Sequence, residues 1–473
     1  MSEAITGLQT PYEYVLLGFV IHSHNHTKSI DVKNNVIMFE IYESIHLPYL
    51  TANFILHDDI TFVDGVKPNG TELVEITVGQ PSVDSPPITL KFIFSSITAT
   101  EKSSDNVEIV KASLIEQCAF NNTLKQFSRS YQGKPSEIIQ KICDNQLGLD
   151  VELPEVEESQ KAIKYIVPFD SAFGACSRVL QKMSTINGLP YFLFRTINDE
   201  KLQLKSLEEI LELPAWNPMP YSFSRANKNN GQKALAAPNI YNVEKFDGGT
   251  LKSGIADLLL DGMMGSEATV IDAGSGAKES FKHNLESTFD MLKSIGVIDN
   301  DYEGSVGTGK YLFNEVPIEE MPNRTFHGII SNNTYNKYPN IHQEMFASSV
   351  KLGMTKRAVG HLLTRSMVKM QVPGVPYLFD GTNRSIGTNI DFLITSNILD
   401  PSEVEGAIDK QRSGKYMISA ARHIFDDNNE HRVNLEINKL GTLKWVFMEM
   451  VYVGGLVLSK KSAMMFQDWV EQR

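Results

Sequence analysis

A stretch of amphipathic helix between residues 127 and 195 constrains the fold most, because strand-like sequence flanks it on both sides. In its first half, Pro135 suits a first helical turn, and apolar residues then recur every three or four positions until Gly148 ends the pattern. The spacing therefore predicts one helix with a single buried face. That face carries Ile138, Ile139, Ile142, Cys143 and Leu147.

A second helix is predicted in the other half of this stretch. Asp170 is placed to cap its start and Gly188 to end it. Residues 191–195 then read as a strand, with a turn at Asn198 and Asp199. The apolar face of the second helix carries Phe173, Cys176, Val179, Leu180 and Met183.

Length and composition indicate a soluble globular protein of several domains. The 473 residues suggest two to four domains, and 42% hydrophobic with 21% charged residues is ordinary for such a protein. Lys and Arg number 44 against 57 Asp and Glu, which gives a net charge of −13. This negative charge argues against nucleic-acid binding that depends on the neutralisation of phosphates by basic side chains.

The cysteines and the first residues indicate synthesis in a reducing cytoplasm. Cys118, Cys143 and Cys176 are widely separated and odd in number, so neither a disulfide framework nor a zinc cluster is expected. The opening residues show no basic region followed by an apolar core, so no secretory signal is expected. The apolar run 443–459 is short and contains Lys444 and Glu449, and it reads as two strands around a glycine turn rather than a membrane span.

Strand patterns fill both sides of the helical stretch. From residue 14 to 124 about five alternating segments are separated by turn signals, which suggests a small barrel. In one of them Leu50, Ala52, Phe54 and Leu56 share a face. After a helix-or-strand segment near residues 348–372, a second group of strands ends with His431, Val433, Leu435 and Ile437 on one face, after a turn at 427–429.

The order of these segments resembles the tail hub proteins of contractile-tailed bacteriophages, which are related to the hub part of type VI secretion spike proteins. The phrases SRSYQGKPSEIIQKIC, PFDSAFGACSRVL and GLPYFLFRTINDEKLQLKSLEEIL carry the resemblance in the helical stretch. It covers roughly residues 35–215 and 325–440. The matching positions of the strand regions are Ser44, Asp58, Gly70 and Glu72, and then Pro373, Gly374, Gly387, Gly414, Tyr416, Ile418 and His423.

The resemblance implies an α+β, mainly β fold with two tandem similar β-barrel domains. Three chains would form a pseudo-sixfold ring from them, braced by a mixed helical and strand middle domain. The expected division is 1–125 for the first barrel, 126–218 plus 250–325 for the middle domain, 219–249 plus 326–441 for the second barrel, and 442–473 for a C-terminal apolar extension.

The implied function is that of a virion structural protein in the tail baseplate. A homotrimer would adapt the sixfold tail tube to the threefold central spike and let DNA pass during ejection. The expected partners are the tail tube or tube-initiator protein and the spike protein, with tape measure and baseplate wedge proteins as further candidates. A hub of a non-phage contractile injection system is an alternative. No specific nucleic-acid binding and no membrane span are expected.

Three groups of residues are candidate sites. The loop 304–311, GSVGTGKY, is similar to a phosphate-binding loop, but Tyr311 follows Lys310 where Ser or Thr would hold magnesium. His22, His24 and His26 could gather a metal on one strand face, but no acidic or thiol ligand is near in sequence, so a solvated face is expected.

The third group, Glu155, Glu157 and Glu158, reads as a charge run in an exposed loop. His423 is expected to pack or hydrogen-bond inside the second barrel. No catalytic, cofactor-binding or metal-binding residue and no cofactor are therefore expected. The alternative from another class is an enzyme, either a nucleotide hydrolase using Lys310 or a cell-wall glycosidase.

Overall fold

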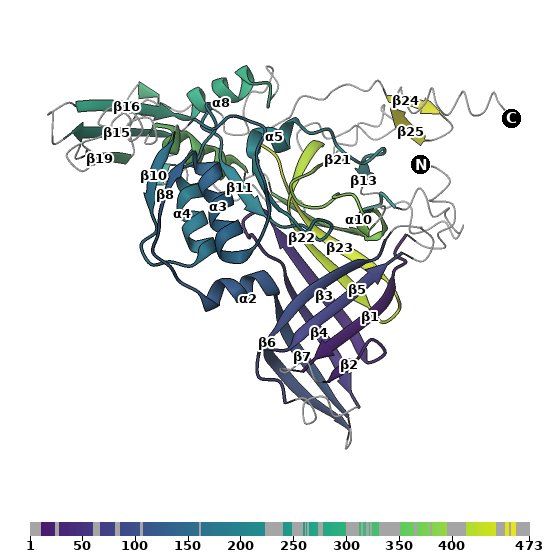
Figure 1. Cartoon of the computed structure of the whole chain (residues 1–473). Coiled ribbons are helices and arrows are strands. Elements are labelled where there is room, and N and C mark those ends of the chain that lie inside the picture. Colours follow the sequence, from purple (N-terminus) through teal and green to yellow (C-terminus); the bar gives the residue numbers. More distant parts are fainter. Residues whose placement is uncertain are drawn as a thin grey trace.

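The computed structural model covers the whole chain (Figure 1). It describes residues 11–23, 28–59, 67–80, 86–104, 107–159, 162–222, 240–247, 264–272, 278–298, 324–330, 351–363, 367–378, 381–394 and 413–440. Short pieces at 259–260, 262, 312–313, 316–317, 321, 450–453 and 456–459 are described as well. The fold is mainly β, with few helices.

One large, almost entirely antiparallel sheet of 13 strands runs through the described part of the chain. Its order is β14-β20-β23-β22-β3-β4-β7-β6-β5-β1-β2, and β21 and β13 branch off from β22. The strands fall into two groups, because those on either side of the β3–β22 pair enclose separate cores. We name β1–β7 the N-terminal strand set, and β13, β14 and β20–β23 the C-terminal strand set.

The N-terminal strand set wraps one apolar core. Side chains of its strands alternate between this core and the outside, and Leu50, Ala52, Phe54 and Leu56 all point inward as the sequence predicts. Where β6 passes beyond β5 it pairs with β7 alone, and this long hairpin projects from the set (Figure 1). The strands are β1 Val15–His22, β2 Ser29–Asp31, β3 Val36–Ser44, β4 Thr51–Asp58, β5 Leu73–Gly79, β6 Ile88–Ser104 and β7 Val107–Glu116.

The Gly-x-Glu motif before β5 has a structural role. Gly70 lies at φ +93, which favours glycine. The carboxylate of Glu72 is buried and accepts hydrogen bonds from the backbone N–H groups of Asn69, Gly70 and Thr71 at 3.0–3.2 Å. A buried carboxylate thus fixes the turn that starts the strand.

The C-terminal strand set has its own core, which also takes in helices from elsewhere in the chain. As predicted, His431, Val433, Leu435 and Ile437 face inward along β23, after a turn in which Asn429 adopts φ +58. The helix-or-strand segment is a helix over 351–363 followed by β20. The elements are β13 Tyr221–Ser222, β14 Lys245–Asp247, β20 Val368–Pro373, α10 Val375–Leu378, β21 Asn389–Leu393, β22 Gly414–Asp426 and β23 His431–Asn438.

The two strand sets meet in a ladder between β3 and β22, which we call the joint. The long strand β22 serves three neighbours: β23 along most of its length, β21 over its first part and β3 over its last part. Residues 420–426 of β22 pair with residues 38–44 of β3. A bulge between Ile418 and Ala420 marks the change of neighbour.

The helical stretch forms a block beside the joint with a third core (Figure 1). Helix α3 spans Pro135–Leu147 and ends at Gly148 with φ +66, as predicted. Helix α4 spans Ala172–Lys182, and here the predicted limits are wrong. Its other elements are α2 Gln117–Leu124, β8 Ser130–Gly133, β9 Val151–Glu152, β10 Ile163–Ile166, β11 Tyr191–Phe194, β12 Leu202–Ser206 and α5 Leu207–Glu212.

The true limits of α4 follow from its caps. The hydroxyl of Ser171, rather than Asp170, accepts from the Gly174 N–H at 3.2 Å, because Asp170 is engaged by Arg178 at 2.7 Å. At the other end Met183 is already extended, so the helix ends before Gly188, which lies in a later turn at φ +83.

The expectation of a solvated acidic loop is wrong for Glu158. Its carboxylate is buried and accepts from the Ser136 hydroxyl at 2.5 Å and, more weakly, from the Ser136 N–H at 3.3 Å. It therefore caps the start of α3 from a distant part of the chain. Glu157 beside it is exposed, as expected.

Residues 264–330 add a small three-stranded sheet, β16-β15-β19. The apolar spacing of Phe281, Leu285 and Phe289 fits a helix, but the helix begins only at Leu285, because residues 278–284 pair with β15 as a strand. The expected domain boundary at 325/326 falls inside β19, which pairs in parallel with β15. The elements are β15 Gly265–Asp272, β16 Lys278–Asn284, α8 Leu285–Ser294, β17 Leu312–Phe313, β18 Val316–Pro317 and β19 Arg324–Ile330.

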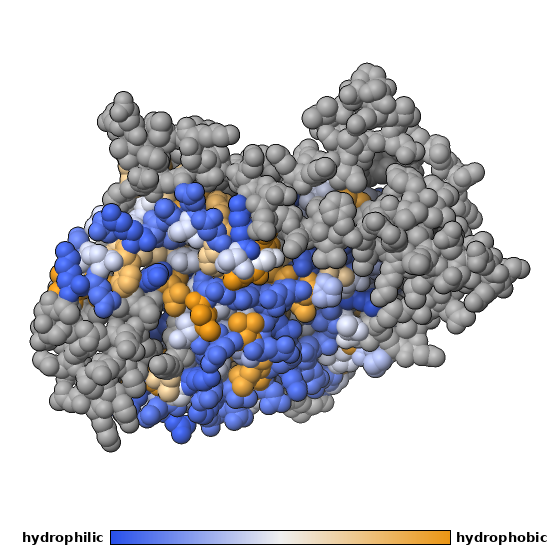
Figure 2. Space-filling view, turned by 90° about the horizontal axis from the view of Figure 1, so that it is seen from above, coloured by the Kyte–Doolittle hydropathy of each residue, from blue (hydrophilic) through white to orange (hydrophobic). Residues whose placement is uncertain are grey.

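Near the C-terminus, β24 Met450–Val453 and β25 Leu456–Ser459 form the predicted hairpin around Gly454 and Gly455. Trp445 and its apolar neighbours at 441–449 lie outside the described residues. No helix in the described part of the chain is long and apolar enough to cross a membrane. Seen from above, the coloured surface is mostly hydrophilic with scattered hydrophobic residues (Figure 2).

Candidate functional site

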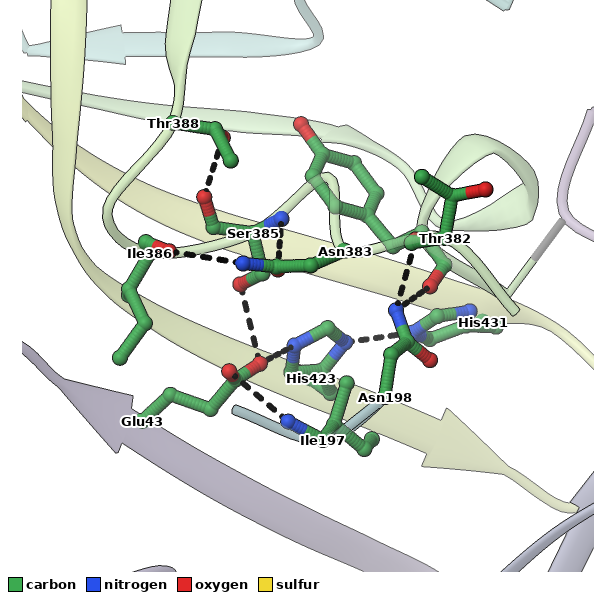
Figure 3. Close-up of polar contacts among 11 residues, drawn as sticks. Glu43, Ile197, Asn198, Thr382, Asn383, Ser385, Ile386, Thr388, His423 and His431 are labelled. Atoms are coloured by element: carbon green, nitrogen blue, oxygen red, sulfur yellow. Dashed lines mark hydrogen bonds and ion pairs between the residues drawn. The ribbon is translucent and has the colours of Figure 1, made fainter. Parts of the chain in front are cut away.

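A buried polar cluster lies on the inner face of the joint (Figure 3). Its centre is the side chains of Glu43, His423 and His431, of which Glu43 is 2% exposed and the two histidines 0%. A carboxylate is almost never fully buried unless it is paired. We call these three residues, with the partners described below, the Glu43 cluster.

The register of three neighbouring strands brings the centre of the cluster together. Glu43 of β3 stands opposite Ala421 of β22, so His423 is its diagonal neighbour on the same face. Along β23, His431 stands opposite Phe425, two residues beyond His423. All three polar side chains therefore point to the same interior.

The carboxylate of Glu43 accepts from three donors. Its Oε1 receives the His423 Nε2–H at 2.5 Å and the Ser385 hydroxyl at 2.9 Å. Its Oε2 receives the backbone N–H of Ile197 at 3.1 Å. These donors come from the C-terminal strand set and from the helical block, so one side chain of the N-terminal set bonds to both other parts of the chain.

The hydrogen-bond chain continues from His423 to His431, whose facing nitrogens, Nδ1 and Nε2, lie 3.1 Å apart. Burial and the neighbouring His423 hold the pKa of His431 well below its ordinary value, so His431 is neutral. Its Nδ1 has no hydrogen-bond partner among the residues that the structure describes. Because an unpaired buried N–H costs more than an unpaired lone pair, we assign the proton to Nε2, which donates to His423.

Two glycines allow the close packing around the cluster. A Cβ on Gly374 would lie 2.2 Å from ring atoms of His431, which no real contact permits. A Cβ on Gly387 would lie 2.4 Å from the ring of Phe194, and Gly387 also adopts φ +71. Both positions belong to the family resemblance, and each brings a loop backbone against a buried ring.

A second contact joins the helical block to the part of the chain between Gly374 and Gly387. The side-chain amide of Asn198, next to Ile197, donates to the backbone oxygens of Tyr377 and Thr382, each at 3.1 Å. The hydroxyl groups of Tyr221 and Tyr377 lie 3.2 Å apart in the adjoining core. The Glu43 cluster is thus part of a polar interface between the N-terminal strand set, the C-terminal strand set and the helical block.

The arrangement is suited to holding the two strand sets together rather than to catalysis. The Ser385 hydroxyl donates to a carboxylate instead of an imidazole, and like the histidines it is 0% exposed. A nucleophile needs a base within hydrogen-bond reach and a path to substrate. The Glu43 carboxylate is within hydrogen-bond reach of Ser385, but the cluster is closed off from solvent, whereas its paired donors specify one relative position of the two strand sets.

On the outer face of the joint lies an open groove of about 670 Å³. It crosses both strand sets, and residues of β3, β14, β20, β22 and β23 line it. Two of its charged side chains are already engaged: Lys369 with Glu436 at 3.9 Å, and Arg422 with Glu40 at 2.5 Å. Such a broad, ion-paired surface fits contact with a protein better than the enclosure of a small ligand.

Of the three candidate metal-binding histidines and the loop 304–311, the structure describes only His22. His22 of β1 lies 2.8 Å from the Ser29 hydroxyl and 3.5 Å from a carboxylate oxygen of Glu75 on β5, an acidic neighbour that the sequence did not reveal. His24, His26 and the loop 304–311 with Lys310 lie outside the described residues. No group of three His, Cys, Asp or Glu side chains within the described ranges could hold a metal ion.

The prediction that His423 hydrogen-bonds in the interior is confirmed, but the sequence analysis missed its partner Glu43. A signal was present, because Phe39, Ile41 and Glu43 share one face of a strand and a carboxylate on an apolar face needs donors. Ser385 and the Ile197 N–H could not be found this way, since both lie in loops.

No family model matches the chain, and no curated protein matches its sequence. Solved structures do match. A tail protein from Neisseria meningitidis is 12% identical and matches 91% of this chain and 98% of its own length, with a TM-score of 0.47. The 43 kDa tail protein of a Shewanella oneidensis prophage is 10% identical over 90% of this chain and 100% of its own, with a TM-score of 0.49.

A third match is the Francisella PdpA–VgrG complex, at 10% identity over 93% of this chain and 60% of that chain, with a TM-score of 0.40. Two of these three neighbours are tail proteins. At these identities the likeness concerns the course of the chain alone.

Proposed function

We propose that this chain is the structural hub of a phage tail baseplate, a homotrimer that adapts the sixfold tail tube to the threefold central spike. The observation that carries the proposal is the joint: two strand sets with separate cores share one continuous sheet. A chain built in this way is one rigid unit with two strand-built lobes.

Rigidity matters because an adaptor must transmit the position of one partner to the other. The Glu43 cluster supplies three donors from two other parts of the chain to a single buried carboxylate. Breaking such a cluster costs the desolvation of every group left unpaired. The two lobes therefore keep one geometry.

The proposed symmetry of the trimer follows from the two lobes of each chain. If each strand set acts as a barrel, three chains present six barrels and match six tube subunits on one face. The opposite face keeps the threefold symmetry of a spike. Contacts between chains then use sheet edges, where unpaired backbone groups are satisfied by the next subunit.

The charge of the chain fits a passage through which DNA slides. Three copies carry 3 × (−13) = −39. DNA should therefore meet a repulsive or neutral wall rather than a binding groove. Tail tube, spike, tape measure and wedge proteins are the proposed partners, and the assembled virion tail is the proposed location.

A structural role rather than an enzymatic one is supported by the burial of the polar cluster. Its serine and histidines are closed off from substrate by the joint itself. A catalytic role for Lys310 remains the competing proposal, and Lys310→Ala separates the two. A structural hub keeps its assembly after this substitution, whereas a nucleotide hydrolase loses its activity.

Native mass spectrometry of the purified chain with its tail tube and spike proteins tests the hub proposal. The expected hub mass is 3 × 52.9 = 158.7 kDa, in complexes that contain both partners. Six copies per complex, or a chain that stays monomeric with both partners present, would contradict the proposal. A structure in which the two strand sets fail to superpose as similar barrels would contradict its symmetry argument.

A further inference from the structure

Two thiols face each other in the core of the helical block. The Sγ atoms of Cys143 on α3 and Cys176 on α4 lie 3.7 Å apart. Both side chains are completely buried, and both are free thiols. The Glu43 cluster uses neither.

The two helices hold the thiols in this position. Cys143 follows Ile142 on the buried face of α3, and Cys176 lies between Phe173 and Val179 on the buried face of α4. These faces pack on each other in one core. The thiols are therefore neighbours in every folded molecule, although 33 residues separate them in sequence.

We propose that Cys143 and Cys176 are an oxidation site, at which a peroxide forms an intramolecular disulfide that fastens α3 to α4. A disulfide needs an S–S distance of about 2.05 Å. The two sulfurs must therefore approach by about 1.6 Å, which rotation of the side chains and a small shift of the helices supply.

The chemistry proceeds in two balanced steps. One thiolate attacks hydrogen peroxide, so that an S–O bond forms, the O–O bond breaks and water leaves after protonation. The second thiolate attacks the sulfur of this sulfenic acid, so that the S–S bond forms, the S–O bond breaks and a second water leaves. Two thiols are oxidised by two electrons in total, and one peroxide is reduced to two waters.

The reaction is slow in the closed protein. The hydrogen bond between Cys143 and Cys176, together with burial, raises the pKa of the Cys176 thiol well above its ordinary value, so the reactive thiolate is scarce. A small oxidant is also required to reach two buried sulfurs. The pair therefore stays reduced in a thiol-rich cytoplasm and becomes linked under sustained exposure to peroxide.

The test maps the disulfide in the full-length, natively folded chain. The protein is treated with hydrogen peroxide, alkylated in denaturant and digested with trypsin without reduction. Trypsin separates the cysteines, since Cys118, Cys143 and Cys176 fall on peptides 112–125, 142–161 and 165–178. We expect a linked pair of the last two peptides, 2 Da lighter than their sum, which disappears on reduction.

Thermal unfolding gives a second readout. A crosslink between residues 143 and 176 restricts the unfolded chain and should raise the Tm of the protein by about 5 °C, reversibly with reductant. Cys118→Ser should keep both the linked peptide and the shift. Cys143→Ala with Cys176→Ala should lose both.

The proposal is overturned if Cys143 and Cys176 remain fully alkylated after peroxide has consumed an unstructured control thiol. It is also overturned if the recovered links join Cys118 or two different chains. Linkage that occurs only when the peroxide is added in denaturant counts against it as well, because the folded arrangement would then have no part in the reaction. None of these outcomes bears on the hub proposal.

Discussion

Replacing Glu43 with alanine is expected to loosen the joint between the two strand sets. The substitution leaves the His423 Nε2–H and the Ile197 N–H without an acceptor in a site that is 0–3% exposed. The Ser385 hydroxyl loses its acceptor too, but it can rotate. Each buried donor left unpaired costs about 1–3 kcal/mol, and removal of the carboxylate relieves its own desolvation, so we expect a net loss near 3 kcal/mol.

The matched control is Glu101→Ala in the projecting hairpin. Glu101 also belongs to an ion pair, with Lys111 at 3.0 Å, but its side chain is 63% exposed. An exposed pair contributes less than about 1 kcal/mol. The two substitutions therefore remove the same charge and differ in burial and in the number of donors left behind.

Urea unfolding at pH 7.5 measures the free energies, and amide hydrogen exchange locates the change. In Glu43→Ala the amide protons of Ile197 and of the β3–β22 ladder should exchange faster, while those of the ladder between β4 and β7 keep their protection. If Glu43→Ala is no more destabilising than Glu101→Ala, or if the Ile197 amide stays protected, the cluster does not fasten the joint.

Three further predictions concern single groups. Gly374→Ala should destabilise the protein by about 2 kcal/mol because the added Cβ meets the His431 ring. Gly353→Ala lies in the helix over 351–363, where the space is open, and should be neutral or stabilising. Thermal unfolding compares the two variants. The depressed pKa of His431 means that below pH 6.5 the unfolded chain binds a proton that the folded chain excludes. Stability should therefore fall as the pH drops below 6.5, by up to about 1.4 kcal/mol per unit, and His431→Asn should weaken this dependence in urea titrations; an unchanged slope would contradict the assignment. Glu158→Ala should cost about 1–2 kcal/mol by uncapping α3, while its exposed neighbour Glu157→Ala should change stability by under about 0.5 kcal/mol in the same urea assay; equal effects would refute the capping role.

The sequence by itself determined most of the local structure. Strands β4 and β23 were predicted because alternation puts every second residue on one face of a strand, whatever that face packs against. The end of α3 was predicted for a similar reason, since Gly148 adopts a conformation that other residues avoid. These signals act between residues close in sequence, where chain geometry fixes the outcome.

Two helix caps were not predicted from local signals. The predicted cap Asp170 is taken by Arg178, so Ser171 caps α4 instead. Glu158 seemed part of a solvated charge run, but it caps a helix that begins 23 residues earlier in the chain. The partner of Glu158 could be known only from the packed structure, whereas Arg178 lies just eight residues after Asp170.

The joint was decided by tertiary structure alone. Glu43 and His423 are 380 residues apart, and only the pairing of β3 with β22 makes them neighbours. The alternation of β3 could show that Glu43 needs a donor, because a carboxylate on an apolar face must be paired. Which donor it finds depends on the register between two strands from opposite ends of the chain, and no periodicity within either strand encodes that register.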